Sequence, residues 1–120
     1  MYTRVLIVDD HKMFRDGLRG LINAEPGMEV VGEAVDGKEA IEVARKLSPD
    51  IVIMDISMPG MNGIEAMRHL INESPKVKVI MLSMYSSAPL VQSALAAGAS
   101  GYVMKGSDFA ELAAAIRSVK

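Results

Sequence analysis

Polar side chains that could act together follow the short apolar runs of this 120-residue sequence. Asp9 and Asp10 follow the first run, and Asp55 follows the third. Ser83 follows the fourth run and Lys105 the fifth. Taken alone, an aspartate after a strand is often only the N-cap of the next helix. Capping explains one acid in each loop but not the whole set, so the joint pattern indicates a shared site.

The three carboxylates predict a bound cation. Two carboxylates about 4 Å apart repel each other by roughly 4 kcal/mol at an effective dielectric constant of about 20. Because the chain has no cysteine, oxygen ligands and a hard ion are favoured, and Mg²⁺ fits best. A carboxylate beside Mg²⁺ is a nucleophile for phosphoryl groups, which makes Asp55 a candidate acceptor. Lys105 could neutralise phosphoryl oxygens, and Ser83 could donate a hydrogen bond to one of them.

Such a site requires strands that all end at one edge of a sheet. Short β-branched runs alternate with segments of helical period, as expected for strands covered by helices on both faces. This alternation predicts an α/β fold, a doubly wound, flavodoxin-like (βα)5 sheet of parallel strands in the order 2-1-3-4-5. Ligands in such sheets bind beyond the carboxyl ends of the strands, where the strand order reverses. The predicted strands are Val5–Val8, Val30–Val31 with Ala34, Ile51–Met54, Val79–Leu82 and Tyr102–Met104.

Apolar stripes and capping residues indicate where the helices lie. Asp36 with Glu39, and Asn62 with Glu65, have the spacing of capping boxes, although Ser or Thr is more typical at the first position. Proline beyond the second and third helices, and glycine after the first and fourth, is typical of helix ends. The stripes are Phe14–Ile22, Ala40–Leu47, Ile64–Ile71, Val91–Leu95 and Phe109–Val119, and the residues at the helix ends are Pro49, Pro75, Gly27 and Gly98.

Composition limits the class of protein. Half of the residues are hydrophobic and the length fits one domain, so we expect a single globular unit over residues 1–120. A net charge of −2 without a basic stripe gives no reason to expect nucleic-acid binding by this segment. No apolar run is long enough for a membrane span or a signal peptide, and the lack of cysteine fits a reducing cytoplasm.

The same residues carry a resemblance to a known family. Asp9-Asp10, the segment from Met54 to Gly63, Ser83 and Met104-Lys105, in this order and spacing, resemble the receiver domain of bacterial two-component response regulators. The resemblance covers nearly the whole chain, and the central segment is its most specific part. It implies a signalling switch rather than an enzyme, with only self-catalysed phosphorylation and dephosphorylation. It also implies a sensor histidine kinase as partner.

The resemblance also assigns roles to individual residues. It implies that Asp55 accepts the phosphoryl group and that Asp10 and Asp55 bind Mg²⁺ together with the backbone carbonyl of Ser57. Asp9 would act on the ion mainly through water. Three further residues take part in the implied switch: Ser83 as the switch hydroxyl, Lys105 as the phosphate clamp and Tyr102 as the aromatic whose rotamer follows activation. The surface of the fourth and fifth helices, or of the first and fifth, is a hypothesis for a phosphorylation-dependent homodimer or output interface.

Two further segments resemble the NarL/LuxR-type subfamily, Asp10–Arg15 and Ala97–Tyr102. Its members usually carry a C-terminal helix-turn-helix domain that binds DNA. We expect that domain to lie outside this chain, so that DNA is reached only through it. A stand-alone receiver that acts by protein contact is the alternative.

Some residues depart from the family pattern or have less specific interpretations. Gly106 stands where many receivers have proline, often in a cis bond, and a cis bond before a non-proline residue costs roughly 2.5–4 kcal/mol. We therefore do not expect that geometry. Met84 and Tyr85 follow the switch serine and could narrow access to Asp55. The two histidines, His11 and His69, are expected to be surface helix residues, and Met58 and Met61 are expected to pack.

Other functions fit the residues less well. A Mg²⁺-dependent phosphohydrolase with an aspartyl-phosphate intermediate needs an acid two residues after the nucleophile, where this chain has Ser57. A flavin carrier needs a hydroxyl- and glycine-rich phosphate loop after the first strand, and Asp9 and Asp10 would repel the phosphate. A degenerate receiver that only docks is disfavoured because all five polar site residues are present.

Overall fold

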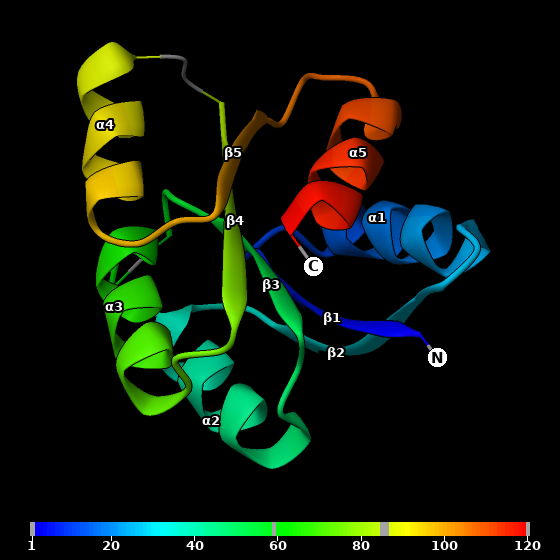
Figure 1. Cartoon of the computed structure of the whole chain (residues 1–120), viewed down its shortest axis with the longest axis horizontal. Helices are drawn as coiled ribbons and strands as arrows, with labels where there is room; N and C mark the ends of the chain where they lie inside the picture. Colours follow the sequence, from blue (N-terminus) through cyan, green and yellow to red (C-terminus); the bar gives the residue numbers. More distant parts are fainter. Residues whose placement is uncertain (1, 59, 85–86, 120) are drawn as a thin grey trace.

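The computed structural model describes residues 2–58, 60–84 and 87–119. Five parallel strands form one sheet in the order β2-β1-β3-β4-β5, which confirms the predicted fold class and strand order. Helices cover both faces of the sheet (Figure 1). The strands are β1 (Thr3–Val8), β2 (Met28–Ala34), β3 (Ile51–Asp55), β4 (Lys78–Ser83) and β5 (Gly101–Met104). The helices are α1 (Lys12–Ala24), α2 (Gly37–Leu47), α3 (Gly63–Glu73), α4 (Ala88–Ala96) and α5 (Phe109–Val119).

The strands run slightly beyond the predicted apolar runs. β3 and β4 each include the polar residue that follows the run, so Asp55 and Ser83 are themselves the last residues of their strands. Backbone pairing explains this extension, since a polar side chain at a strand end leaves its main chain free to continue the ladder. Asp55 pairs with Leu82, and Ser83 pairs with Met104.

Two apolar cores lie on opposite faces of the sheet. Alternate residues of a strand point to opposite faces, so Leu6 and Val8 belong to one core and Val5 and Ile7 to the other. The first core contains the buried residues of α2, α3 and α4, and the second those of α1 and α5. Figure 1 shows this division of the helices. The strands are therefore covered on both sides, as their continuous β-branched runs predict.

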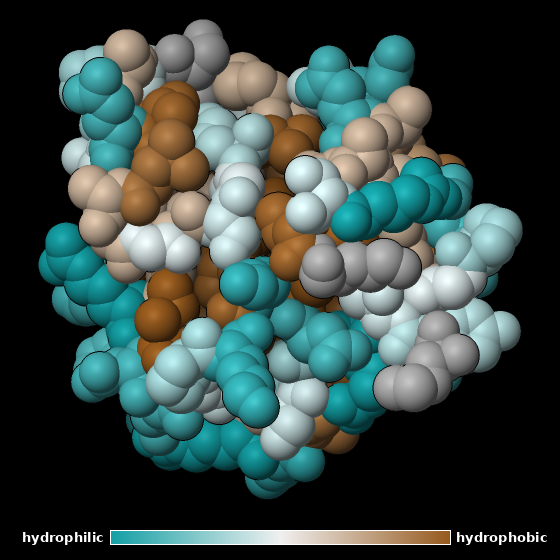
Figure 2. All heavy atoms as spheres, viewed as in Figure 1, coloured by the Kyte–Doolittle hydropathy of each residue, from teal (hydrophilic) through white to brown (hydrophobic). Residues whose placement is uncertain are grey.

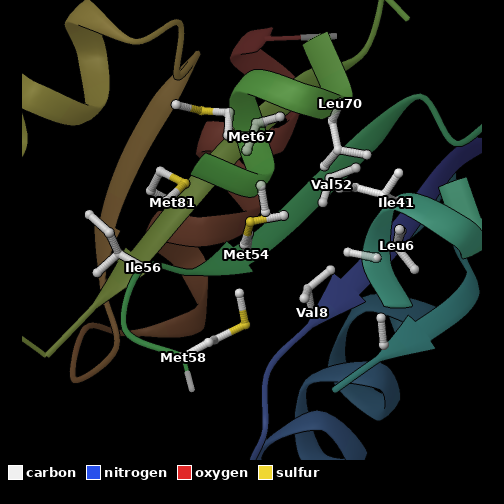
Figure 3. Packing of buried hydrophobic residues seen from close by; sticks show 14 of the residues in the cluster. Leu6, Val8, Ile41, Val52, Met54, Ile56, Met58, Met67, Leu70 and Met81 are labelled. Carbon is white, nitrogen blue, oxygen red and sulfur yellow. The ribbon is translucent and has the colours of Figure 1, made fainter. Parts of the chain in front are cut away.

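Methionine fills much of the core next to Asp55. Met54, Met67 and Met81 are fully buried, and Met58 is nearly so. Figure 3 shows these side chains in one group with Ile56 at its side, near β3, β4 and α3. The flexible thioether adapts to irregular gaps, and the expected packing role of Met58 is confirmed. Met61 is partly buried against the same core, whereas Met13 and Met84 are exposed.

The helix ends follow the predicted signals. The side chain of Asp36 accepts a hydrogen bond from the Glu39 amide at 2.8 Å, and Asn62 accepts one from the Glu65 amide at 2.9 Å. The Glu39 side chain in turn accepts a hydrogen bond from the amide of Val35, one residue before the N-cap. Gly63, the first residue of α3, lies so close to Asp55 that an added Cβ would be 2.6 Å from its carbonyl oxygen. Glycine at this position therefore lets α3 begin directly behind the end of β3.

The face seen in Figure 2 divides by hydropathy. Hydrophobic residues reach the surface in the upper left, over α4, and hydrophilic residues cover the lower edge, over α2. α4 buries only Ala94 and leaves Leu95 about half exposed. Within the described ranges, none of the helices combines the length and the apolar character that crossing a membrane requires.

Candidate functional site

Four strand ends bring the predicted site residues to one edge of the sheet. Asp55 ends β3 and Ser83 ends β4, while Asp9 and Lys105 directly follow β1 and β5. The amide of Asp9 donates to the carbonyl of Ala34 at 3.0 Å, and the amide of Lys105 donates to the carbonyl of Ser83 at 2.8 Å. These bonds extend the strand ladders by one residue. Because β1 and β3 are neighbours in the sheet, Asp9 and Asp55 meet where the strand order reverses.

Lys105 joins two of the carboxylates. Its Nζ lies 2.6 Å from Oδ2 of Asp9 and 3.2 Å from Oδ2 of Asp55, and its side chain is only 8% exposed. The ring of Phe14 on α1 covers the ammonium at 4.6 Å from the ring centroid, a cation–π contact. Burial lowers the pKa of Lys105, but pairing with Asp9 and then with Asp55 outweighs this and raises it above its ordinary value. Lys105 is therefore held as a cation.

Asp55 is a buried carboxylate with a donor on each oxygen. The backbone amide of Ser57 donates to its Oδ1 at 3.0 Å, and Lys105 donates to its Oδ2 at 3.2 Å. Burial raises the pKa of Asp55 above its ordinary value, since the Ser57 amide and the Lys105 charge only partly offset the loss of hydration, and the charge of Asp9 raises it further. The ionised form of Asp55 is therefore destabilised by its surroundings, and a further cation nearby would stabilise it.

Asp10 and His11 lie at the solvent side of the same cluster. The ring Nδ1 of His11 is 3.0 Å from Oδ1 of Asp9 and 3.2 Å from Oδ1 of Asp10. The side chain of His11 is 68% exposed and that of Asp10 is 32% exposed. His11 is at the surface, as predicted, but it is the N-cap of α1 rather than a residue within the helix, and its ring contacts both carboxylates. His69 is exposed on α3, as predicted.

Arg15 fixes the backbone beneath the cluster. Its Nη1 donates to the carbonyl of Asp9 at 2.7 Å, and its Nε donates to Glu33 on β2 at 3.0 Å. Arg19, one turn later in α1, also binds Glu33. The Arg15 side chain is only 12% exposed, so its rigid fork holds the turn after β1 against β2.

The cluster has the properties of a site for a divalent cation. One ligand atom from each of Asp9, Asp10, His11 and Asp55 lies within 4.8 Å of all the others. With the His11 ring counted as neutral, the three carboxylates and the Lys105 ammonium carry two net negative charges. Asp9 is fully buried, and its Oδ2 has the ion pair with Lys105 but no hydrogen bond. Oxygen donors and a doubly negative pocket fit Mg²⁺.

The remaining predicted residues surround this cluster. Ser57, exposed after β3, turns its amide to Asp55. Ser83 is fully buried, and Tyr102 on β5 is partly buried and packs against the core on the α3 and α4 side. The described residues contain no cis peptide bond, so Gly106 follows Lys105 in trans, as expected. Met84 is 67% exposed, whereas Tyr85 lies outside the described residues.

The sequence pattern also hints that Arg15 has a partner outside its helix. A cation near the start of a helix is unfavourable because the N-terminal end carries a partial positive charge. α1 has no acidic residue in its first turn, yet Arg15 follows closely. A basic residue there, next to a pair of aspartates, needs an acceptor outside the helix. Phe14 had no comparable signal, because its spacing fitted the core stripe equally well.

Comparisons with known proteins all point to one protein family. Residues 5–117 match the family model described as the response regulator receiver domain. The transcriptional regulatory protein DegU of Brevibacillus brevis is 42% identical over 116 residues, which are 97% of this chain and 49% of DegU. The chain thus spans about half the length of that relative.

Two solved structures are similar over nearly the whole chain. A LuxR-family two-component response regulator from Aurantimonas sp. SI85-9A1 has 43% identity and a TM-score of 0.95, covering 99% of this chain and 85% of that one. The receiver domain of the putative response regulator NarL from Mycobacterium tuberculosis has 32% identity and a TM-score of 0.92, covering 98% and 94%. The family model, the relative and the two solved structures agree with one another. The chain therefore belongs to the response regulator receiver domain family of two-component systems, in its NarL/LuxR-type group.

Proposed function

We propose that this chain is a phosphorylation-controlled signalling switch, in which a sensor histidine kinase transfers a phosphoryl group to Asp55 in the presence of Mg²⁺. The carrying observation is the environment of Asp55. One of its oxygens faces the Lys105 ammonium at 3.2 Å, and the other accepts the Ser57 amide at 3.0 Å. Asp9 and Asp10 lie beside it in the same cluster. A carboxylate fixed in this way is oriented for attack rather than merely buried.

Each bond that forms in the phosphoryl transfer to Asp55 is matched by a bond that breaks. A carboxylate oxygen of Asp55 attacks phosphorus, an O–P bond forms, and the P–N bond of the kinase phosphohistidine breaks. The imidazole leaves with the electron pair and takes up a proton. Mg²⁺ held by Asp10, Asp55 and the Ser57 carbonyl, with Asp9 acting through water, would neutralise phosphoryl oxygens. Lys105, already a cation between Asp9 and Asp55, stabilises the negative charge on the transferred group.

The free energy available for switching is comparable with the free energy that switching needs. A phosphoryl group adds close to two negative charges and three acceptor oxygens. New charge-assisted hydrogen bonds from Ser83 and Lys105, each worth about 1.5–3 kcal/mol, would contribute roughly 3–6 kcal/mol. Inverting a 1:99 population needs about 5.5 kcal/mol. Movement of Ser83 toward the phosphoryl group would open space for Tyr102, and the surface of α4 and α5 would change with it.

The output of the switch lies in transcription control, through a DNA-binding segment outside this chain. The support is the relative named as a transcriptional regulatory protein, of which this chain matches about half. A homodimer that forms on phosphorylation, through α4 and α5 or through α1 and α5, would link the receiver to paired DNA sites. No turnover of external phosphate esters is expected, only formation and hydrolysis of the acyl phosphate on Asp55.

Intact-mass spectrometry tests the acceptor. The protein is incubated with acetyl phosphate and Mg²⁺, then compared with Asp55→Asn and with Asp16→Asn, a control carboxyl at the surface of α1. Wild type and Asp16→Asn should each gain one phosphoryl group, and Asp55→Asn should gain none. Replacing Mg²⁺ by a chelator should abolish the gain. Equal labelling of Asp55→Asn, or no labelling of wild type, would contradict the proposed function.

A further inference from the structure

The imidazole of His11 makes this cluster different from a site built of carboxylates alone. His11 is the N-cap of α1, but its side chain makes no capping hydrogen bond to the helix. Instead its Nδ1 lies 3.0 Å from Asp9 Oδ1 and 3.2 Å from Asp10 Oδ1. Since 68% of the side chain is exposed, an ion arriving from solvent can reach the ring. The ring is held by a hydrogen bond between Nδ1 and Oδ1 of Asp9, not by capping, so its nitrogen already faces the carboxylates at ligand spacing.

We infer that His11 is a nitrogen ligand for a later first-row transition cation, such as Co²⁺ or Cu²⁺, bound by the same cluster. The inference rests on the proposed function in that it uses the same metal site. It goes further because it assigns a ligand and a preference among cations. Mg²⁺ prefers oxygen ligands, whereas imidazole suits the later divalent ions.

The separations of the ligand atoms support a shared ion. In an octahedral shell with bonds of about 2.1 Å, two adjacent ligands are about 3.0 Å apart and two opposite ones about 4.2 Å. The Nδ1 of His11 is 3.0 Å and 3.2 Å from the two nearest carboxylate oxygens, which fits two adjacent edges. The ligand atoms of all four residues, Asp55 included, lie within 4.8 Å of one another. Shifts of a few tenths of an ångström would bring them around one ion.

The electrostatics of the buried part of the site point the same way. Asp9 is fully buried, and its Oδ2 faces the Lys105 ammonium at 2.6 Å, while its Oδ1 faces His11. Two negative charges remain after Lys105 is counted. A divalent ion would neutralise these two charges. The His11 nitrogen, at the solvent side of the cluster, would determine which divalent ion binds most tightly.

The test compares two cations and two histidines. Isothermal titration calorimetry at one fixed neutral pH measures the dissociation constants of Mg²⁺ and Co²⁺ for wild type, His11→Gln and His69→Gln. His69 is the matched control, because it is the other histidine of the chain and is exposed on α3. We expect His11→Gln to weaken Co²⁺ binding at least tenfold while Mg²⁺ binding changes less than twofold. His69→Gln should leave both constants unchanged.

A spectroscopic measurement removes any ambiguity from affinity alone. Electron spin-echo modulation of bound Cu²⁺ should show a coordinated imidazole nitrogen in wild type and His69→Gln, and none in His11→Gln. Equal losses of Co²⁺ and Mg²⁺ affinity in His11→Gln, or no loss of either, would overturn the inference. If wild type binds no Mg²⁺ but still binds Co²⁺ through His11, the proposed function fails and this inference stands.

Discussion

Removal of the charge on Asp55 should stabilise the metal-free domain at neutral pH. At 3.2 Å from Lys105 Nζ, the carboxylate gains about 5 kcal/mol of attraction at an effective dielectric constant of about 20. Asp9 and Asp10 lie within 4.8 Å, so each repels it by about 3.5 kcal/mol on the same scale. The balance is a repulsion of about 1–2 kcal/mol, to which burial adds. Asp55→Asn keeps the shape and removes this charge.

The sign of the pH dependence follows from the raised pKa of Asp55. Burial is the main cause of that shift. A carboxyl whose pKa is higher in the folded state contributes stability below its unfolded pKa, about 3.9, and loses it as the pH rises through the folded value. The difference in free energy of unfolding between Asp55→Asn and wild type, in favour of the variant, should therefore be small near pH 4 and increase toward pH 7.5.

Urea unfolding followed by circular dichroism measures this difference in the presence of a chelator. Asp55→Asn should be more stable than wild type by about 1–2 kcal/mol at pH 7.5, with an unchanged slope against urea. Adding Mg²⁺ at about ten times its dissociation constant should stabilise wild type by about 1.4 kcal/mol and close most of the gap. Asp16→Asn is the surface control. A variant that is less stable than wild type without metal, at every pH, would refute the charge argument.

Three further outcomes test other parts of the structure. Arg15→Ala should weaken Mg²⁺ binding about tenfold by calorimetry, because the bond to the Asp9 carbonyl is lost, and Arg15→Lys should be intermediate. Gly63→Ala should lower the free energy of unfolding by about 1–3 kcal/mol, since its Cβ would clash with the Asp55 carbonyl. Gly17→Ala, in open space within α1, should instead raise it by up to about 1 kcal/mol. Treatment with acetyl phosphate should double the mass seen in sedimentation, and an unchanged mass would count against dimer control.

The strand ends were predictable because they depend on local pattern and topology. An apolar β-branched run followed by Asp55 or Lys105 specifies both a buried strand and the edge where its last side chain lies. The contacts of His11 and Arg15 were not predictable in the same way. They depend on the direction in which α1 leaves the turn after β1, and on Glu33 of β2 as a second acceptor. Helical periodicity does not encode these long-range geometries.

The unequal packing of the helices indicates where a change at Asp55 can spread. α3 buries four residues and begins against the main chain of Asp55, so a shift there would disturb the core directly. α4 buries only Ala94, and its N-cap Ser87 makes no side-chain capping bond. Segments with little buried apolar surface open at the lowest free energy. New phosphoryl contacts would supply roughly 3–6 kcal/mol, which is enough to rearrange the lightly packed α4 but not the well-packed α3. We therefore expect a change at Asp55 to alter the protein surface through β4 and α4.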